Sequence, residues 1–251
     1  MIDTVLFDMG GTLENVVHDE ETLTAAANKA IEILRAEGVE LGLETSKLAR
    51  MMEDGFLRYK EYQVGVELEL KPERIWNEYI LEPIKNRETF LNDALCERLA
   101  HMWEITYYRR ELREGVVEML EGLKSLNMRM GIISNTASLF QVFAVLEEYG
   151  IRDYFEDVTL SSIVGYRKPD RRIFDIALRQ MQADAKKTAY AGDTLARDVI
   201  GARNAGLAKT FRIQSFLSIS RDQALVGSMR ADHEISSIME IYEILRDQSE
   251  A

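Results

Sequence analysis

The sequence predicts an α/β fold, a doubly wound parallel sheet whose first strand is followed by an inserted all-helical region. Three observations predict it. An apolar strand-length run at residues 4–7 stands alone at the start of the chain. Helical patterns then follow one another between Asn15 and Arg110, and from Arg113 onward helical and strand patterns alternate. Such alternation is typical of a parallel sheet wrapped by helices and joined by right-handed crossovers.

The alternating part contains four further strands. We expect helices at 114–127, 137–150, 171–180 and 196–205, with strands at 128–133, 157–160, 188–191 and 209–213. The tail at 231–235 precedes a closing helix. The carboxyl ends of parallel strands meet at one edge of the sheet, where ligands bind in open α/β folds.

The helical part is expected to contain helices at 21–37, 46–62, 72–84 and 92–108. The segment 64–70 alternates apolar and polar residues, which fits either a short strand or a loop between helices. Aromatic residues recur here at helical spacing, which favours the core of this region over a substrate platform. They are Phe56, Tyr59, Tyr62, Trp76, Tyr79, Trp103 and Tyr107.

Four short segments place polar side chains near this sheet edge. The first strand runs into Asp8, followed by Gly10 and Gly11, and an aspartate in that place is ordinarily a turn former or helix cap. The other three segments weigh against that ordinary interpretation. They are the strand that ends in Ser134 and Asn135, the loop with Lys168 before Pro169, and the strand that ends in Gly192 and Asp193 with Asp198 one turn later.

Together these segments, in this order, resemble the four motifs of the haloacid dehalogenase-like (HAD) superfamily. The resemblance covers the first dozen residues and nearly all of the chain from about Arg110. It implies a Rossmann-like core formed by residues 1–15 and 110–251. It also implies that residues 16–109 form a helical C1 cap, a small mobile domain that closes over the active site.

The resemblance also implies a reaction. Asp8 would attack phosphorus and form an aspartyl-phosphate, which splits one displacement into two easier ones. Mg²⁺ would bind Asp8, the carbonyl of Gly10 and Asp193, with Asp198 as ligand or support. Ser134, Asn135, Lys168 and Thr12 would contact the substrate, and Lys168 and Ser134 would take part in catalysis. The charges agree with this, because phosphoryl transfer to a carboxylate needs positive charge in the cleft.

One position departs from the family pattern. Phosphatases of this family carry a second aspartate two residues after the nucleophile, as general acid and base, and here that residue is Gly10. Proton transfer by such a group contributes roughly 10²–10⁴-fold. The substrate could therefore have a stable leaving group, as acyl phosphates, aryl phosphates and phosphoanhydrides do. Alternatively Glu14 or His18 could supply the proton, although both are ordinarily solvated residues near a helix start.

Gly10 also fits two functions besides phosphatase activity. Family members that cleave carbon–phosphorus or carbon–halogen bonds also lack the second aspartate. Dehalogenases carry tyrosine there and need no metal, whereas phosphonate hydrolases carry a small residue and use a cap lysine, for which Lys47 and Lys60 are candidates. Lastly, the chain could be a phosphometabolite-binding or regulatory protein that has lost turnover, although a pure binder would not need a nucleophile such as Asp8.

Composition limits the partners. With 251 residues, 46% of them hydrophobic, the chain can bury a sizeable core. Its net charge of -12 disfavours nucleic acid and anionic membranes as partners. Cys96 is the one cysteine, so no internal disulfide can form, which suits a reducing compartment. No signal peptide or membrane-spanning segment is apparent, so we expect a cytoplasmic protein. The sequence thus predicts a Mg²⁺-dependent phosphatase of a small phosphorylated metabolite, of unknown oligomeric state.

Overall fold

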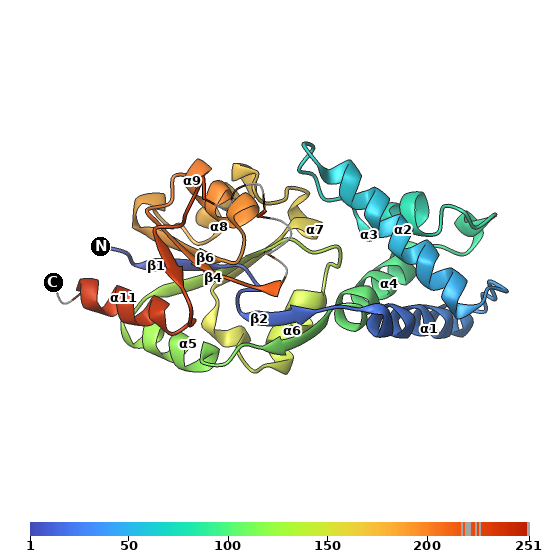
Figure 1. Cartoon of the computed structure of the whole chain (residues 1–251), viewed down its shortest axis with the longest axis horizontal. Coiled ribbons are helices and arrows are strands. Elements are labelled where there is room, and N and C mark those ends of the chain that lie inside the picture. Colours follow the sequence, from blue (N-terminus) through green and yellow to red (C-terminus); the bar gives the residue numbers. More distant parts are fainter. Residues whose placement is uncertain (217, 219–221, 224, 226, 250–251) are drawn as a thin grey trace.

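The architecture is a parallel sheet sandwiched between helices, with a helical insertion at one end (Figure 1). It is taken from a computed structural model that describes residues 1–216, 218, 222–223, 225 and 227–249. The sheet has the order β5-β4-β1-β6-β7-β8, and all its strand pairs are parallel. The predicted α/β fold is therefore confirmed.

The strands carry apolar side chains on both faces, as the interior of a doubly wound sheet requires. Central strand β1 is fully buried and pairs with β4 on one side and β6 on the other. The strands are β1 (Thr4–Phe7), β4 (Arg129–Ser134), β5 (Asp157–Leu160), β6 (Thr188–Gly192), β7 (Lys209–Ile213) and β8 (His233–Ile235). In this register Phe7 lies opposite Ile132 and Ala191, so the residues that follow β1, β4 and β6 emerge at one edge.

Two layers of helices cover the sheet. One layer holds α5 (Val116–Ser125), α6 (Gln141–Glu148) and α11 (Glu240–Ser249), whose side chains pack on Val5 and Phe7. The other holds α8 (Arg171–Gln180) and α9 (Ile200–Asn204), which pack on Leu6. The connections between these strands and helices contain four short elements. They are α7 (Ser161–Val164), the 3₁₀ turns Arg152–Tyr154 and Ala185–Lys187, and the π-helix η5 (Leu195–Val199), which leads directly into α9.

The helical insertion, which we define as the elements between β2 and β3, has its own apolar core. It contains α1 (Glu20–Ala36), α2 (Thr45–Gln63), α3 (Pro72–Ile75), the π-helix η1 (Trp76–Ile80), the 3₁₀ turn Arg87–Thr89 and α4 (Asp93–Thr106). Capping residues start two of these helices. Asp19 accepts from the Thr22 N–H at the start of α1, and Asn92 accepts from the Leu95 N–H at the start of α4.

The structure adds a connection that the sequence analysis did not predict. Strands β2 (Glu14–Val17) and β3 (Arg109–Leu112) form an antiparallel ribbon with Val16 opposite Arg110, so both chain crossings into the helical insertion lie side by side. These strands are short and lie at the boundary of the helical pattern, where residue patterns are least informative. The ribbon places Arg110 and Glu14 next to the first motif.

Three expected elements differ from the structure. The helix expected at 137–150 begins only at Gln141, because the preceding loop binds a glutamate of the helical insertion. The helix expected at 72–84 ends as the π-helix η1 at Ile80, and the one expected at 196–205 begins as the π-helix η5. Segment 64–70 forms no strand of its own, but Leu68 makes an isolated antiparallel bridge to Tyr166.

Candidate active site

A cavity lies where the carboxyl edge of the sheet meets the helical insertion. Seven of the eight residues predicted for the site line it: Asp8, Gly10, Ser134, Asn135, Lys168, Asp193 and Asp198. Thr12 is absent from the lining. Its side chain is fully buried, and its hydroxyl has no hydrogen-bond partner among the described residues. Thr12 therefore offers no surface to a substrate in this conformation.

A tight turn after β1 brings Asp8 close to the end of β6. The Asp8 N–H donates to the Ala191 carbonyl at 2.9 Å, which continues the strand pairing up to the predicted nucleophile. Gly11 follows with φ of +93°, a left-handed conformation that favours glycine. A Cβ atom on Gly11 would also overlap the carboxylate of Asp193. The glycine therefore allows the two motifs to approach.

Lys168 ties three motifs together. Its buried ammonium donates to Asp8 Oδ1 at 2.6 Å, to Asp198 Oδ1 at 2.7 Å and to Tyr190 Oη at 2.8 Å. The Asn135 side chain holds the Lys168 backbone on both sides, accepting from its N–H at 2.9 Å and donating to its carbonyl at 3.1 Å. Asn135 thus positions the lysine loop as well as lining the cavity.

Burial and mutual contact shift the titration of this cluster. Burial raises the pKa of Asp8, an effect that Lys168 opposes only in part. Burial acts to raise the pKa of Asp198, but contact with Lys168 outweighs it and lowers that pKa. Burial acts to lower the pKa of Lys168, but contact with Asp198 and Asp8 outweighs it and raises that pKa. The lysine is therefore a fixed positive charge beside the predicted nucleophile.

Asp198 is bound on all sides by protein donors. Its Oδ1 accepts from Lys168 and, at 3.1 Å, from Tyr190. Its Oδ2 accepts from the Thr194 N–H at 3.0 Å and from the Thr194 hydroxyl at 2.5 Å. These bonds suit a carboxylate that orients Lys168 and the loop after β6 better than one that ligates a cation directly.

Tyr190 was missed by the sequence analysis. It lies in β6, a strand in which every residue is buried, so nothing in the sequence distinguishes Tyr190 from an ordinary core residue. In the structure its hydroxyl is hydrogen-bonded to both Lys168 and Asp198.

The residues present fit a divalent cation. Asp8, Asp193 and Asp198 each offer a carboxylate oxygen, and these atoms all lie within 4.8 Å of one another. Lys168 pairs with two of these carboxylates, Asp8 and Asp198. Hard oxygen ligands are those that Mg²⁺ prefers, and it commonly takes one or two carboxylates directly.

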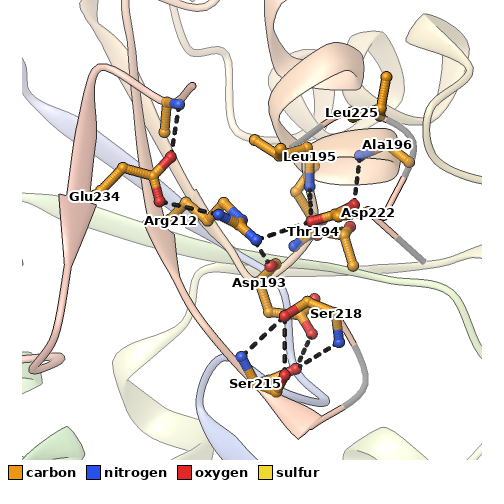
Figure 2. A network of polar contacts seen from close by, with 12 residues as sticks. Asp193, Thr194, Leu195, Ala196, Arg212, Ser215, Ser218, Asp222, Leu225 and Glu234 are labelled. Carbon is orange, nitrogen blue, oxygen red and sulfur yellow. Dashed lines mark hydrogen bonds and ion pairs between the residues drawn. The ribbon is translucent and has the colours of Figure 1, made fainter. Parts of the chain in front are cut away.

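A polar network fixes Asp193 in place (Figure 2). The Ser215 hydroxyl donates to Asp193 Oδ2, and Arg212 Nε donates to the Asp193 carbonyl at 3.2 Å. Arg212 also binds Asp222, which accepts the N–H groups of Leu195 and Ala196 at 2.7 and 3.1 Å. The network links the end of β6, the start of η5 and the loop after β7.

The two residues considered as replacement acids do not face the cavity. Glu14 is fully buried, not solvated as its sequence context suggested, and binds Arg110 at 2.8 Å and Tyr149 at 3.2 Å. The His18 ring lies tilted against Tyr107, with ring centroids 4.8 Å apart, and its Nδ1 is hydrogen-bonded to the Tyr107 hydroxyl at 3.0 Å. Neither residue is part of the cavity lining.

The helical insertion contributes part of the cavity lining. Glu104 and Lys60 line it, whereas Lys47 does not. Phe56, Tyr59 and Trp103, expected only in the core of the helical insertion, line it as well. The Phe56 and Trp103 rings stack with centroids 4.0 Å apart, so this wall is both core and cavity surface.

Buried glutamates hold the helical insertion against the sheet. Glu69 accepts from Ser161 Oγ at 2.7 Å and pairs with Arg167, next to Lys168. Glu97 accepts from Ser138 Oγ at 2.5 Å, in the loop after β4. The loops that carry Ser138 and Arg167 are therefore fixed partly by residues of the helical insertion.

The parallel sheet and the acidic cluster at its carboxyl edge define an α/β hydrolase. The chain belongs to the haloacid dehalogenase-like hydrolase family, whose model matches residues 2–206. The resemblance noted in the sequence is thereby confirmed.

Relatives with named activities match part of the chain. Pyrimidine 5'-nucleotidase YjjG of Escherichia coli is 36% identical over 154 residues, 59% of this chain and 62% of that protein. Glyceraldehyde 3-phosphate phosphatase of Methanothermobacter thermautotrophicus is 32% identical over 123 residues, 49% of this chain and 54% of that protein. The chain thus spans little more than half the length of these curated relatives.

A solved structure matches almost the whole fold. The HAD phosphatase from Thermococcus onnurineus superimposes with a TM-score of 0.64 at 21% identity, covering 97% of this chain and 98% of that chain. At this identity the likeness shows the fold alone. Among the described residues, no helix has the length and apolar character to cross a bilayer.

Proposed function

We propose that this hydrolase is a phosphatase that removes the phosphoryl group of a small phosphorylated metabolite through an aspartyl-phosphate on Asp8. The observation that carries the proposal is the contact of Asp8 Oδ1 with Lys168 Nζ at 2.6 Å, both residues lining the cavity. A carboxylate held beside a fixed cation, with Ser134 on the same wall, suits attack on an anionic phosphoryl group.

The chain's own residues take the following parts. A carboxylate oxygen of Asp8 attacks phosphorus, and the bond from phosphorus to the leaving oxygen breaks. Lys168 and the Ser134 hydroxyl hold phosphoryl oxygens, which requires Lys168 to exchange one of its three present acceptors. Water then attacks the phosphorus of the aspartyl-phosphate, and Asp8 is regenerated as inorganic phosphate leaves.

Mg²⁺ is the cofactor that the site fits. Asp8, the Gly10 carbonyl and Asp193 would hold it, with Asp198 orienting Lys168 beside them. When bound, the cation supplies positive charge that offsets the repulsion between the carboxylates and an anionic substrate.

Phosphate release tests the proposal. The substrates are acetyl phosphate, p-nitrophenyl phosphate and ethyl phosphate with Mg²⁺, and the proteins are wild type, Asp8→Asn and the exposed control Asp153→Asn. We expect Asp8→Asn to reduce release to background and Asp153→Asn to match wild type. Absence of any Asp8-dependent release would refute the proposal and favour a binding role.

A second candidate function is favoured by Lys60. This residue of α2 lines the same cavity as Asp8 and Gly10. In phosphonate hydrolases of the family, a cap lysine forms an imine with an aldehyde substrate. Lys60 occupies a place from which such an imine could face Asp8.

Borohydride trapping distinguishes the two functions. With phosphonoacetaldehyde, an imine on Lys60 forms with loss of water, and its reduction by borohydride would leave a stable secondary amine that increases the mass of the chain by that of the aldehyde less one oxygen atom. We expect no such adduct if the protein is a phosphatase. An adduct formed by wild type and absent in Lys60→Met, but present in Lys47→Met, would favour phosphonate cleavage.

A further inference from the structure

The space beside Gly10 is filled by a side chain from the ribbon. A Cβ atom at position 10 would lie 3.2 Å from Arg110 Nη1, 3.7 Å from Val16 Cγ2 and 3.9 Å from Glu14 Oε2. Gly10 is not among the residues with positive φ, so its backbone does not require glycine. The guanidinium of Arg110 therefore approaches the place where an acidic side chain at position 10 would start.

Arg110 is held in that place by two carboxylates. Its Nε donates to the Glu104 carbonyl at 2.7 Å, Nη1 donates to Glu14 Oε2 at 2.8 Å, and Nη2 donates to Glu104 Oε2 at 2.7 Å. A guanidinium has five N–H groups, so these three bonds leave one donor on each terminal nitrogen. The side chain is 12% exposed and lines the cavity together with Asp8 and Lys168. Arg110 thus combines a fixed position with donors that can reach a ligand.

No proton donor takes the place of the absent acid within this group. Glu14 is fully buried and is committed as an acceptor to Arg110 and Tyr149. Glu104 accepts from Arg110 with one oxygen and from the Ala137 N–H at 3.3 Å with the other. Burial acts to lower the pKa of Arg110, but Glu14 and Glu104 outweigh it and raise that pKa. A guanidinium of this kind donates hydrogen bonds but does not release a proton.

We propose that Arg110 hydrogen-bonds the leaving oxygen of the substrate, and that the enzyme acts on phosphorylated compounds whose leaving group departs as an oxyanion, above all acyl phosphates. This inference rests on the proposed function. A guanidinium matches a carboxylate with two parallel donors, so a departing carboxylate suits Arg110 better than a departing alkoxide does. A departing alkoxide would need a proton, which the guanidinium of Arg110 does not release.

The proposed steps balance without a general acid. As the bond from Asp8 to phosphorus forms, the electron pair of the breaking bond stays on the leaving oxygen, which departs as a carboxylate that accepts from Arg110. Water then adds to phosphorus, the bond to Asp8 breaks, and the proton released by the water is retained by the phosphate product.

The test is the dependence of kcat/KM on leaving-group pKa across acetyl phosphate, a series of aryl phosphates and ethyl phosphate. The variants are Arg110→Lys, which keeps the charge but loses the planar fork, and Arg110→Met with Glu14→Gln, which leaves no unpaired charge at Glu14. Arg109→Met is the matched control, because Arg109 lies on the same strand with a side chain 61% exposed.

We expect wild type to lose activity steeply as leaving-group pKa rises. Loss of a charged hydrogen bond, about 1.5–3 kcal/mol, corresponds to a decrease of roughly 10- to 100-fold on acetyl phosphate for the Arg110 variants. The decrease should differ along the series, whereas Arg109→Met should follow wild type. An equal decrease on every substrate would show a merely structural role and overturn the inference.

Gly10→Asp provides a second test. The new carboxylate would meet Arg110 Nη1 and be held ionised, so this variant alone should gain little on ethyl phosphate. Gly10→Asp combined with Arg110→Met should gain at least about 10-fold relative to Arg110→Met. An equal gain with and without Arg110 would overturn the inference. If wild type shows no Asp8-dependent phosphate release on any of these substrates, the proposed function itself is refuted.

Discussion

Nζ of Lys168, a residue that lines the cavity, lies 2.8 Å from the phenolic oxygen of the buried Tyr190. An ammonium only donates, so Tyr190 accepts from Lys168 and can donate to Asp198 Oδ1 at 3.1 Å or to the Ile133 carbonyl at 3.4 Å. Burial raises the pKa of Tyr190 well above its usual value, so the hydroxyl stays protonated. Tyr190 is therefore a positioning residue for Lys168.

Tyr190→Phe should weaken phosphate binding. One net hydrogen bond is worth about 0.5–1.5 kcal/mol, so we expect the inhibition constant of inorganic phosphate to rise roughly 2- to 12-fold. The conservative change keeps the ring and its packing on Phe174. Tyr154→Phe, far from the cavity, serves as control. Unchanged phosphate affinity in Tyr190→Phe would show that Lys168 does not depend on this bond.

Asp193 and Asp198 should differ in their effect on metal binding. Asp198 is occupied by Lys168, Tyr190 and Thr194, so Asp198→Asn should weaken Mn²⁺ binding only about 10- to 100-fold, as for residues that support a ligand. Asp193→Asn should weaken it more, because a direct ligand is lost. Electron paramagnetic resonance titration with Mn²⁺ measures both without turnover. The reverse order would make Asp198 the direct ligand.

Much of the site could be predicted because its residues follow strands. Asp8, Ser134 and Asp193 come directly after apolar strands whose parallel order is readable from alternation, so their meeting at one edge follows from topology. Lys168 was found only through its motif, since a lysine in a loop is ordinarily solvated. The resemblance to the family also placed Thr12 in the site, where the structure instead buries it.

The residues that close the site could not be predicted in the same way. Arg110 and Glu104 reach the cavity only because the β2–β3 ribbon and α4 pack against the sheet, and such contacts between distant segments leave no periodic pattern. Glu14 looked solvated for the same reason, because its partner Arg110 is 96 residues away in the sequence. Tyr190 looks like any buried strand residue until its hydroxyl is seen beside Lys168.

Glu97 should contribute strongly to stability. This buried carboxylate of α4 accepts from the Ser138 hydroxyl at 2.5 Å, from the Leu139 N–H at 2.9 Å and from the Phe140 N–H at 3.3 Å. Glu97→Ala leaves those donors without an acceptor, which typically costs about 1–3 kcal/mol. Urea denaturation should show this decrease in unfolding free energy, with the exposed Glu118→Ala near wild type. A decrease below about 0.5 kcal/mol would mean that water replaces the carboxylate.

His233 should make stability depend on pH near neutrality. Its ring stacks on Phe211 with centroids 5.0 Å apart, and burial, together with nearby Lys209, lowers the pKa of His233 in the folded state. The unfolded chain, with the ordinary pKa of about 6.5, therefore takes up this proton first as pH falls. The contribution of neutral His233 is complete above that value and is lost as pH falls through 6.5 toward the folded-state pKa. Urea denaturation at pH 7.5 and 5.5 should thus show a smaller pH-dependent decrease in unfolding free energy for His233→Gln than for wild type. Equal decreases would show that His233 titrates alike in the folded and unfolded states.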